Sequence, residues 1–330
     1  MSSPLLDVPL LDVRGLSKVY EIRSTAGRLR GRVRAVHDVS FQLWRGETYG
    51  LVGESGCGKS TTGRALPRLV EPTGGEALFE SRDVFTLSRS ELRGLRKKIQ
   101  MIFQDPYSSL NPRKRVGAIL EEAMTIHRIL DPAGRRDRAF QMLERVGFSE
   151  EHYYRFPHEF SGGQRQRIGI ARALTVSPEL IICDEPVSAL DVSIQAQVIN
   201  MLRELQREFG LTYFFISHDL SVIRHISDRV GVMYLGELVE EAPTASLYAE
   251  PKHPYTQALL SAVPLARPRG RRERVVLSGE VPSAANPPGG CTFHTRCLFA
   301  MPRCATEVPA RRTVSEGHVV ACHLYEGAVA

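Results

Sequence analysis

The 330-residue sequence has no run of 18 apolar residues, so it predicts no helix that could span a membrane. Its first eleven residues lack a basic segment followed by a long apolar core, which argues against a secretory signal peptide. We therefore expect the chain to stay in the cytoplasm. The sequence also contains no internal repeat and no heptad run of the kind that forms coiled coils.

Cysteine is scarce, with six residues in the chain, and unevenly placed. Cys57 and Cys183 stand alone, whereas four cysteines fall in the last 40 residues. These four are Cys291, Cys297, Cys304 and Cys322. Without a secretory signal a disulfide-bonded domain is disfavoured, so clustered thiols in a chain of this kind indicate a metal site.

The overall composition is that of an ordinary soluble protein, with 42% apolar and 24% charged residues. The length favours roughly two domains and allows a full hydrophobic core without covalent staples. The net charge of +6 suits nucleic acid, an anionic membrane surface or a nucleotide, but it equally fits a solvated basic surface.

Three regions differ in their patterning. Residues 10–50 alternate apolar and polar side chains, which predicts paired strands, with the Arg- and Gly-rich residues 23–34 as an exposed loop or hairpin tip. Strands and helices then alternate from residue 48 to about 233, which predicts an α/β fold with a mostly parallel sheet covered by helices. From about residue 251 onward, prolines crowd a tail with little periodicity, and we expect it to need a staple or a partner surface.

The alternating region yields nine predicted elements. The predicted strands are residues 49–52, 99–103, 180–183, 212–216 and 229–234. The predicted helices are residues 117–129, 135–146, 163–174 and 193–209.

A phosphate-binding motif follows the first of these strands. Its residues are Gly53, Glu54, Ser55, Gly56, Cys57, Gly58, Lys59, Ser60 and Thr61, which fit the pattern G-x-x-x-x-G-K-[ST]. The glycines let several backbone N–H groups point at one phosphate chain. Lys59 supplies a cation for the β- and γ-phosphates and Ser60 a hydroxyl for Mg²⁺. A chance glycine-rich turn is the alternative, and the strand-loop-helix context argues against it.

Two adjacent carboxylates end the predicted strand at 180–183. Asp184 is suited to hold Mg²⁺, and Glu185 is placed to polarise an attacking water. Strands often end in acidic residues, but the phosphate-binding motif in the same chain favours the catalytic interpretation. Cys183 fits a small buried apolar residue.

A second glycine-rich segment precedes the predicted helix at 163–174. It contains Ser161, Gly162, Gly163 and Gln164, with Ser161 as the predicted N-cap. This segment lies between the phosphate-binding loop and the acidic strand end. That order of motifs resembles the ATP-binding-cassette (ABC) ATPases. The resemblance implies that two cassettes pair head to tail, each signature segment covering the γ-phosphate held by the other's loop. Phe160 departs from the family's commoner Leu, and we expect little loss from it.

Four further positions match this family. The resemblance implies that Tyr20 stacks on adenine, although a tyrosine in a strand core is an alternative. It also implies that Gln104 senses Mg²⁺ and faces the membrane subunits, that residues 188–191 join the two sites, and that His218 contacts the γ-phosphate and Glu185.

Three blocks resemble one subgroup more closely: QDPYSSLNP at 104–112, PKHPYT at 251–256 and GEVPS at 279–283. They are similar to ATP-binding subunits of bacterial dipeptide and oligopeptide importers. The resemblance implies ATP and Mg²⁺ as cofactors, two permease subunits, a second and related ATP-binding subunit, and an extracytoplasmic solute-binding protein. It places the chain at the cytoplasmic face of the inner membrane, with no nucleic acid partner.

Other functions share these motifs. Importers of nickel, glutathione or other peptide-like solutes carry the same blocks, as do cassettes of soluble enzyme complexes such as those of phosphonate breakdown. A soluble ABC ATPase acting on nucleic acid or ribosomes is a further alternative, but such proteins usually have two cassettes or a coiled-coil insertion. The resemblance divides this chain into a cassette at 1–250, with a helical subdomain at about 105–175, and a C-terminal extension at 251–330.

For the four clustered cysteines, the resemblance implies a [4Fe-4S] cluster in at least some relatives. Four thiolates could equally close a tetrahedral zinc site, or remain without metal. The spacing lacks the C-x₂-C pairs that are usual for zinc ribbons.

Overall fold

The computed structural model describes residues 8–25, 27–262, 277 and 279–326. They form two compact units. Unit 1 consists of Leu43–Glu47 and Thr86–Ile216, with Val8, and unit 2 consists of Pro9–Gln42, Thr48–Phe85 and the described part of Ser217–Ala330.

Unit 1 contains three parallel strands in the order β6-β7-β8. They are β6 (Ile99–Ile102), β7 (Leu180–Asp184) and β8 (Thr212–Ser217). Ile182 on the central strand lies opposite Met101 on one side and Phe214 on the other. Every residue of β7 and β8 is buried, which explains why these strands appear in the sequence as continuous rather than alternating apolar runs.

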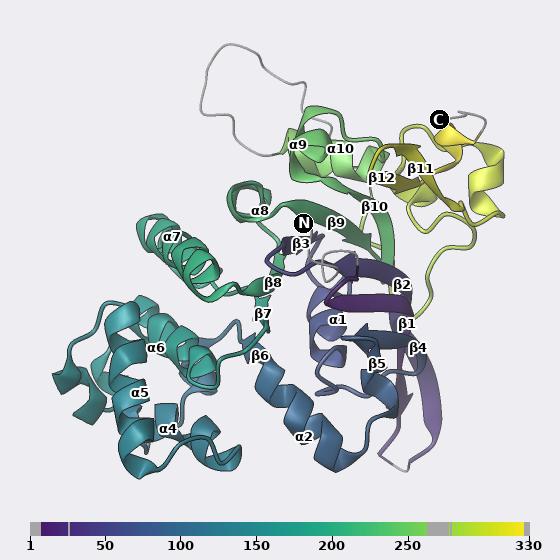
Figure 1. Ribbon diagram of the computed structural model, residues 1–330. Helices are drawn as coiled ribbons and strands as arrows, with labels where there is room; N and C mark the ends of the chain where they lie inside the picture. The colour runs from purple at the N-terminus through teal and green to yellow at the C-terminus, as the bar shows by residue number, and fades with distance from the viewer. Residues whose placement is uncertain (1–7, 26, 263–276, 278, 327–330) are drawn as a thin grey trace. The chain divides into compact units, whose positions relative to one another are not determined.

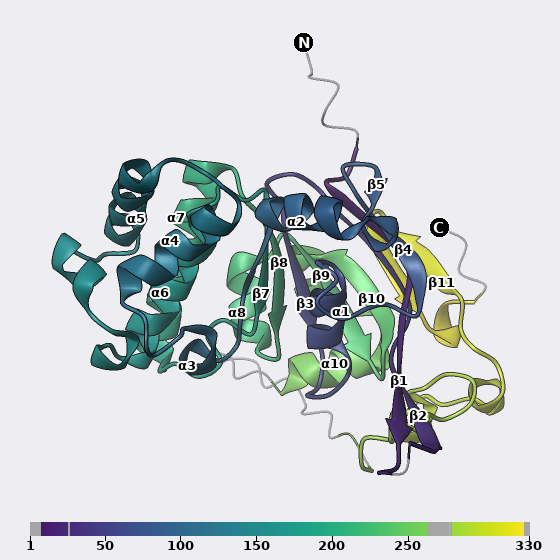
Figure 2. The ribbon, with the colours of Figure 1, turned by 90° about the horizontal axis from the view of Figure 1, so that it is seen from below.

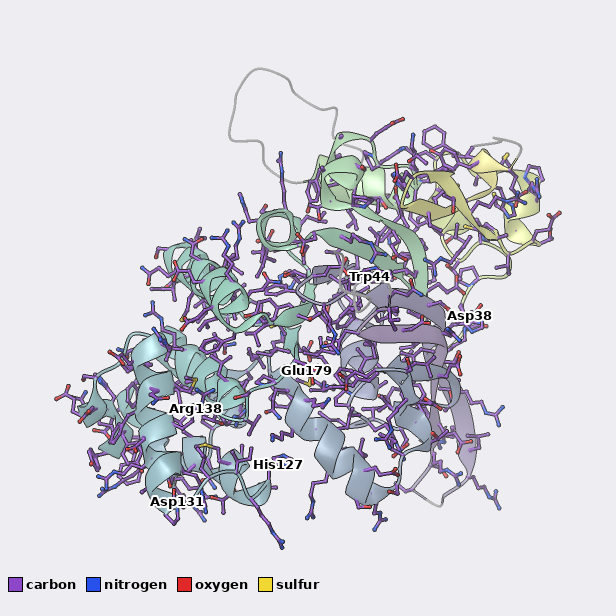
Figure 3. All side chains as sticks on the ribbon, viewed as in Figure 1. Asp38, Trp44, His127, Asp131, Arg138 and Glu179 are labelled. Carbon is purple, nitrogen blue, oxygen red and sulfur yellow. The ribbon has the colours of Figure 1, made fainter. Side chains whose placement is uncertain are left out.

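The helices of unit 1 are α2 (Arg89–Lys98), α3 (Pro106–Ser109), α4 (Val116–Ile126), α5 (Pro132–Arg145), α6 (Gly162–Leu174) and α7 (Val192–Phe209), with the short 3₁₀ helices η2 (Glu150–Tyr154) and η3 (Pro157–Glu159). Four of these α-helices, α2, α3, α5 and α6, begin at a side-chain cap. Asp131 caps α5 by accepting the Gly134 N–H at 2.9 Å, and Pro132 occupies the first helical position (Figure 3). Helices α4, α5 and α6 pack against one another (Figure 1).

Unit 2 contains an antiparallel sheet with the strand order β2-β1-β4-β5 (Figure 2). Its strands are β1 (Leu11–Arg23), β2 (Leu29–Leu43), β4 (Gly74–Phe79) and β5 (Arg82–Asp83). The predicted pairing of strands in residues 10–50 is confirmed. The predicted loop at 23–34 was too long, because β1 continues to Arg23 and β2 already begins at Leu29.

A second group of strands in unit 2 combines parallel and antiparallel pairs. β3 (Thr48–Val52) runs parallel to β9 (Arg229–Tyr234), which pairs antiparallel with β10 (Glu237–Pro243). The helices of this unit are α1 (Lys59–Ala65), α8 (Leu220–Ile226), α9 (Thr244–Ala249) and α10 (Pro254–Ser261), with the 3₁₀ turn η1 (Val84–Thr86).

The C-terminal extension has more regular structure than the sequence predicts. Besides α10 and the 3₁₀ turns η4 (His294–Arg296), η5 (Pro302–Ala305) and η6 (His323–Tyr325), it forms the hairpin β11 (Arg311–Ser315) and β12 (His318–Ala321). β12 pairs antiparallel with β10, Val320 lying opposite Glu240 (Figure 1). The tail is therefore ordered in part by β10 of its own chain, whereas we expected an external staple or a partner surface.

The fold class is confirmed: an α/β protein with an antiparallel N-terminal sheet, mostly parallel core strands and a cysteine-containing extension. Within the ranges that the structure describes, no helix combines the length and the apolar character needed to cross a membrane.

Candidate functional site

The phosphate-binding loop of unit 2 joins the buried strand β3 to α1, as the motif predicts. Two glycines are required there by the approach of other backbone segments. A Cβ on Gly53 would lie 2.1 Å from the Met233 carbonyl oxygen, and one on Gly58 would lie 2.1 Å from that of Ala35. Gly58 also has a φ of 107°, which side chains rarely allow. Glycine is therefore required at these two positions by the fold, so the motif is not a chance glycine-rich turn.

Lys59 is buried, with 4% of its surface exposed, and folds back onto the loop. Its Nζ donates to the carbonyl oxygens of Gly53 at 2.8 Å and Glu54 at 2.9 Å. The Cys57 sulfur lies 3.8 Å from the same nitrogen, and burial raises the pKa of this thiol. Ser60 and Thr61 lie in the first turn of α1, directly after the lysine. The cation is therefore held at the loop that the motif assigns to phosphates.

Glu54, the second residue of the loop, forms an ion pair that the motif does not predict. Its carboxylate accepts two hydrogen bonds from Arg296, at 2.8 and 3.0 Å. Its backbone N–H donates to the Tyr255 hydroxyl at 2.9 Å. Two residues of the C-terminal extension therefore contact this loop within unit 2.

In unit 1, the end of β7 brings three predicted residues together. Asp184 is completely buried, and Glu185 follows it with a φ of 49°, a left-handed conformation that costs energy in a residue of this kind. The Glu185 N–H donates to the Ile216 carbonyl at 3.0 Å, which holds this turn in place. The Gln104 side-chain amide donates to the Glu185 carboxylate at 3.0 Å. Gln104 and Glu185 are therefore in direct contact within unit 1.

The signature segment, also in unit 1, caps α6 as predicted. The Ser161 hydroxyl accepts the Gln164 N–H at 3.3 Å, and the Gln164 side-chain oxygen accepts the Ser161 N–H at 2.9 Å. Ser161 and Gln164 are exposed, and Gly162 and Gly163 are half-buried. A Cβ on Gly163 would lie 2.6 Å from the Ile194 Cγ2, so a side chain would displace α7.

Phe160, the residue that departs from the family pattern, is 4% exposed and packs edge-on against Phe148 at 5.6 Å between ring centroids. Its side chain anchors the segment from inside while Ser161 remains at the surface. The substitution therefore fills an apolar position and leaves the polar edge of the segment unchanged.

Tyr20 and His218 both belong to unit 2. Tyr20 is 39% exposed near the end of β1, with the Lys18 ammonium 4.8 Å from its ring centroid, so it is not a residue of the strand core. His218 follows β8 and is exposed, and Asp219 after it caps α8 by accepting the Ser221 N–H at 2.7 Å. In unit 1, the Ser188 hydroxyl donates to the Glu185 carbonyl at 3.1 Å, which ties residues 188–191 to the acidic strand end.

The four clustered cysteines do not form a ready metal site. Burial raises the pKa of Cys291 to about 12 and that of Cys322 to about 11, and the neighbouring thiols add to both shifts. The four thiols are thus close enough to influence one another. Among the residues that the structure describes, however, no three His, Cys, Asp or Glu side chains are grouped so that they could hold a metal ion. The predicted metal centre has no support from this geometry.

Sequence reasoning missed Arg296 and Tyr255 as neighbours of the phosphate-binding loop. Tyr255 falls in the block at 251–256 that resembles the importer subgroup, but no pattern indicates what it contacts. Arg296 stands 242 residues after Glu54, and nothing local marks it.

Comparison with known proteins defines the class. A family model described as "ABC transporter" matches residues 36–188. Among solved structures, the chain resembles the ATP-binding cassette MJ0796 in its dimeric post-hydrolysis state bound to ADP and Pi, with a TM-score of 0.63 and 28% identity, over 71% of this chain and 98% of that one. The chain belongs to the ABC transporter family, as one of its ATP-binding proteins.

The subgroup follows from longer matches. A model described as "Oligopeptide/dipeptide transporter, C-terminal region" matches residues 239–304. The chain is 58% identical over 320 residues to the oligopeptide transport ATP-binding protein AppF of Bacillus subtilis, covering 96% of this chain and 97% of that protein. It is 50% identical over 317 residues to the dipeptide transport ATP-binding protein DppF of Haemophilus influenzae, covering 96% and 97%. The resemblance that the motifs indicated is confirmed.

Proposed function

We propose that this chain binds and hydrolyses ATP to power the import of dipeptides or oligopeptides. The observation that carries the proposal is the 58% identity, along nearly the whole length, to an oligopeptide transport ATP-binding protein. The phosphate-binding loop with Lys59 bound to its carbonyls supports the nucleotide part of the proposal.

Each motif has a role in this proposal. Residues 53–61 bind the phosphates, with Lys59 as the cation nearest the β- and γ-phosphates, and Tyr20 stacks on the adenine. The Mg²⁺ ligands are the Ser60 hydroxyl, Gln104 and Asp184. Glu185 polarises the attacking water, and the hydrogen bond from Gln104 supports an orienting contact to it. His218 contacts the γ-phosphate.

The signature residues 161–164 act on a second nucleotide. We propose that they cover the γ-phosphate held by a partner cassette, because the two glycines and the capped start of α6 present backbone N–H groups at the surface. The partner is a related ATP-binding subunit, and residues 188–191 connect the two sites. In this proposal residues 1–250 form the cassette, residues 105–175 its helical subdomain and residues 251–330 the extension.

The remaining partners follow from importer function. They are two integral membrane permease subunits and an extracytoplasmic solute-binding protein. The chain lies at the cytoplasmic face of the inner membrane and contacts the permeases through the surface around Gln104. Nickel, glutathione or another peptide-like solute is the alternative cargo, and a soluble enzyme complex the alternative assembly. Purification of the chain with its native partners separates import from a soluble assembly: permease subunits support import, whereas ribosomes, DNA or a soluble lyase contradict it.

Replacing Lys59 with alanine tests the nucleotide site directly. Loss of the loop's buried cation should abolish ATP binding measured by calorimetry, because the β- and γ-phosphates lose their nearest positive charge. Peptide uptake by cells that carry the variant should fall to background. An unchanged ATP affinity would refute the proposed role of the loop. Lys97→Ala, which removes a lysine from α2, is the matched control and should bind ATP normally.

A [4Fe-4S] cluster on Cys291, Cys297, Cys304 and Cys322 is a separate proposal, which rests on the family resemblance and not on the side-chain geometry. Zinc and free thiols are the alternatives. Anaerobically purified protein should contain about four iron and four sulfide per chain and absorb visible light, as thiolate-bound clusters do. Cys304→Ser should abolish both signals, and Cys183→Ala, in β7, should not. Zinc without sulfide, or no metal at all, would contradict the cluster.

A further inference from the structure

The ion pair between Arg296 and Glu54 joins the C-terminal extension to the phosphate-binding loop within unit 2. Its two hydrogen bonds connect Nη1 to Oε2 and Nη2 to Oε1, the bidentate arrangement that fixes orientation as well as charge. The Arg296 side chain is 7% exposed and that of Glu54 is 25% exposed. The pair is therefore more shielded than an ordinary surface salt bridge, for which net effects are small.

Glu54 is held at each of its polar groups. Its carboxylate accepts from Arg296, its N–H donates to the Tyr255 hydroxyl at 2.9 Å, and its carbonyl accepts from the Lys59 Nζ at 2.9 Å. The residue that helps to orient Lys59 is thus itself fixed by two residues from outside the motif.

The Arg296 side chain contacts Tyr234, whose ring packs against those of Tyr255 and Phe293. All three are at most 1% exposed, and their ring centroids lie 4.7 to 5.4 Å apart. The guanidinium lies 5.9 Å from the Tyr234 ring centroid and donates to the Tyr234 hydroxyl at 3.5 Å. A guanidinium held by rigid rings loses little side-chain entropy when it pairs with Glu54.

The extension also borders the loop at a second place. One pocket is lined by loop residues and by residues of the extension. These are Glu54, Ser55, Gly56 and Cys57 from the loop, Tyr234 and Leu235 from the end of β9, and Val281, Pro282 and Ala284 from the extension. Residues of the extension therefore face the loop across this pocket as well as contacting Glu54 directly.

The charge of Glu54 is unfavourable for a loop that binds triphosphate. An unpaired carboxylate next to several phosphate charges raises the free energy of the complex, the more so where water is partly excluded. The guanidinium of Arg296, hydrogen-bonded to the Glu54 carboxylate, offsets its negative charge. The pair therefore lets a glutamate occupy the loop without repelling the ligand.

We propose that Arg296 is a positioning residue for ATP: by neutralising and orienting Glu54, it makes the C-terminal extension part of the nucleotide site of its own chain. This inference rests on the proposed binding of ATP by residues 53–61. It adds to that proposal a residue outside the known motifs, and it assigns the extension a role in nucleotide affinity.

The test measures the dissociation constants of ATP and ADP for the full-length chain by calorimetry. Arg296→Ala should weaken ATP binding about tenfold, and ADP binding less, because ATP carries more negative charge than ADP. Arg303→Ala is the matched control, since Arg303 belongs to the same extension and pairs with Glu307 at 3.0 Å. It removes the same charge and should leave both constants unchanged. Far-UV circular dichroism and melting curves verify that each variant is folded.

The double variant separates charge neutralisation from simple anchoring of the extension. If Arg296 acts by neutralising Glu54, Glu54→Gln combined with Arg296→Ala should recover most of the lost ATP affinity. If Arg296 only anchors the extension, the double variant should bind as weakly as Arg296→Ala, which would overturn the proposal. An Arg296→Ala variant that binds ATP as tightly as the unmodified chain would overturn it as well. Failure of the unmodified chain to bind ATP would instead refute the proposed function.

Discussion

At the scale of single residues, one buried carboxylate of unit 2 has partners in three elements. Glu240, which is 1% exposed on β10, accepts the backbone N–H groups of Lys252 at 2.6 Å and His253 at 3.0 Å. Its carboxylate also bonds to the His318 Nε2 at 2.7 Å. One carboxylate thus links β10, the start of α10 and β12, so it joins the extension to the core of this unit.

His253 gives this arrangement a pH dependence. It is 1% exposed and caps α10 by accepting the Tyr255 N–H at 3.1 Å. Burial lowers its pKa to about 4, although nearby Glu240 opposes the shift. In the unfolded chain the His253 imidazole takes up a proton near pH 6.5, whereas in the folded chain it stays neutral until about pH 4. Neutral His253 therefore makes its full contribution to the free energy of unfolding above pH 6.5. This contribution is lost as the pH falls toward 4.

His253→Asn should therefore make the free energy of unfolding less dependent on pH below about 6.5. Asparagine retains a side-chain acceptor for the helix cap but does not titrate. Between pH 7 and pH 5, the unmodified chain should lose about 2 kcal/mol more unfolding free energy than the variant. Urea unfolding at both pH values measures this difference, with His225→Asn, at an exposed position of α8, as the control. Equal losses in the unmodified chain and the His253 variant would contradict the assignment.

The residues of the nucleotide site differ in how far the sequence could predict them. The loop at 53–61, the acidic pair at 184–185 and the capped Ser161 are each set by local chemistry, because glycine, lysine, carboxylate and capping residues stand at fixed spacings. Arg296 could not be predicted in the same way. Its partnership with Glu54 depends on the folding of the extension against the loop, and no local pattern records it.

At the scale of elements, the bounds of the nine predicted strands and helices lie within three residues of the observed ones, whereas α2 and β10 were not predicted. Some of the errors have physical causes. Helix α5 begins at Pro132, three residues before the predicted start, because proline is favoured at the first helical position. Residues 29–34 were predicted as part of a loop because they are rich in arginine. Yet Arg30, Arg32 and Arg34 alternate with smaller or apolar residues, the period-two pattern of a strand.

The hairpin β11–β12 lay beyond the reach of local patterns. Its stability depends on the pairing of β12 with β10, about 80 residues earlier in the chain, because a two-stranded hairpin alone is only marginally stable in water. Proline-rich flanks made the tail appear irregular. The tertiary partner therefore supplied the order that the sequence pattern lacked.

At the scale of the whole molecule, one chain contains one phosphate-binding motif and one signature motif. If each nucleotide is enclosed by the loop of one cassette and the signature of another, a single chain cannot complete either site. ATP then acts as the contact between two cassettes, and hydrolysis separates them. The equilibrium between paired and separated cassettes then depends on the lifetime of bound ATP before it is hydrolysed.

Glu185→Gln should shift that equilibrium to the paired state. Glutamine preserves the size of the side chain but cannot act as a base toward the attacking water, so ATP should bind and persist. In the complex assembled with its partner subunits, ATPase activity should fall at least a hundredfold, and light scattering of the detergent-purified cassettes should show an ATP-dependent pair. Combining this change with Lys59→Ala should abolish the pair, because the nucleotide no longer binds. Full ATPase activity in the Glu185→Gln complex would exclude Glu185 as the base, and an ATP-independent pair would show that the contact does not require the nucleotide.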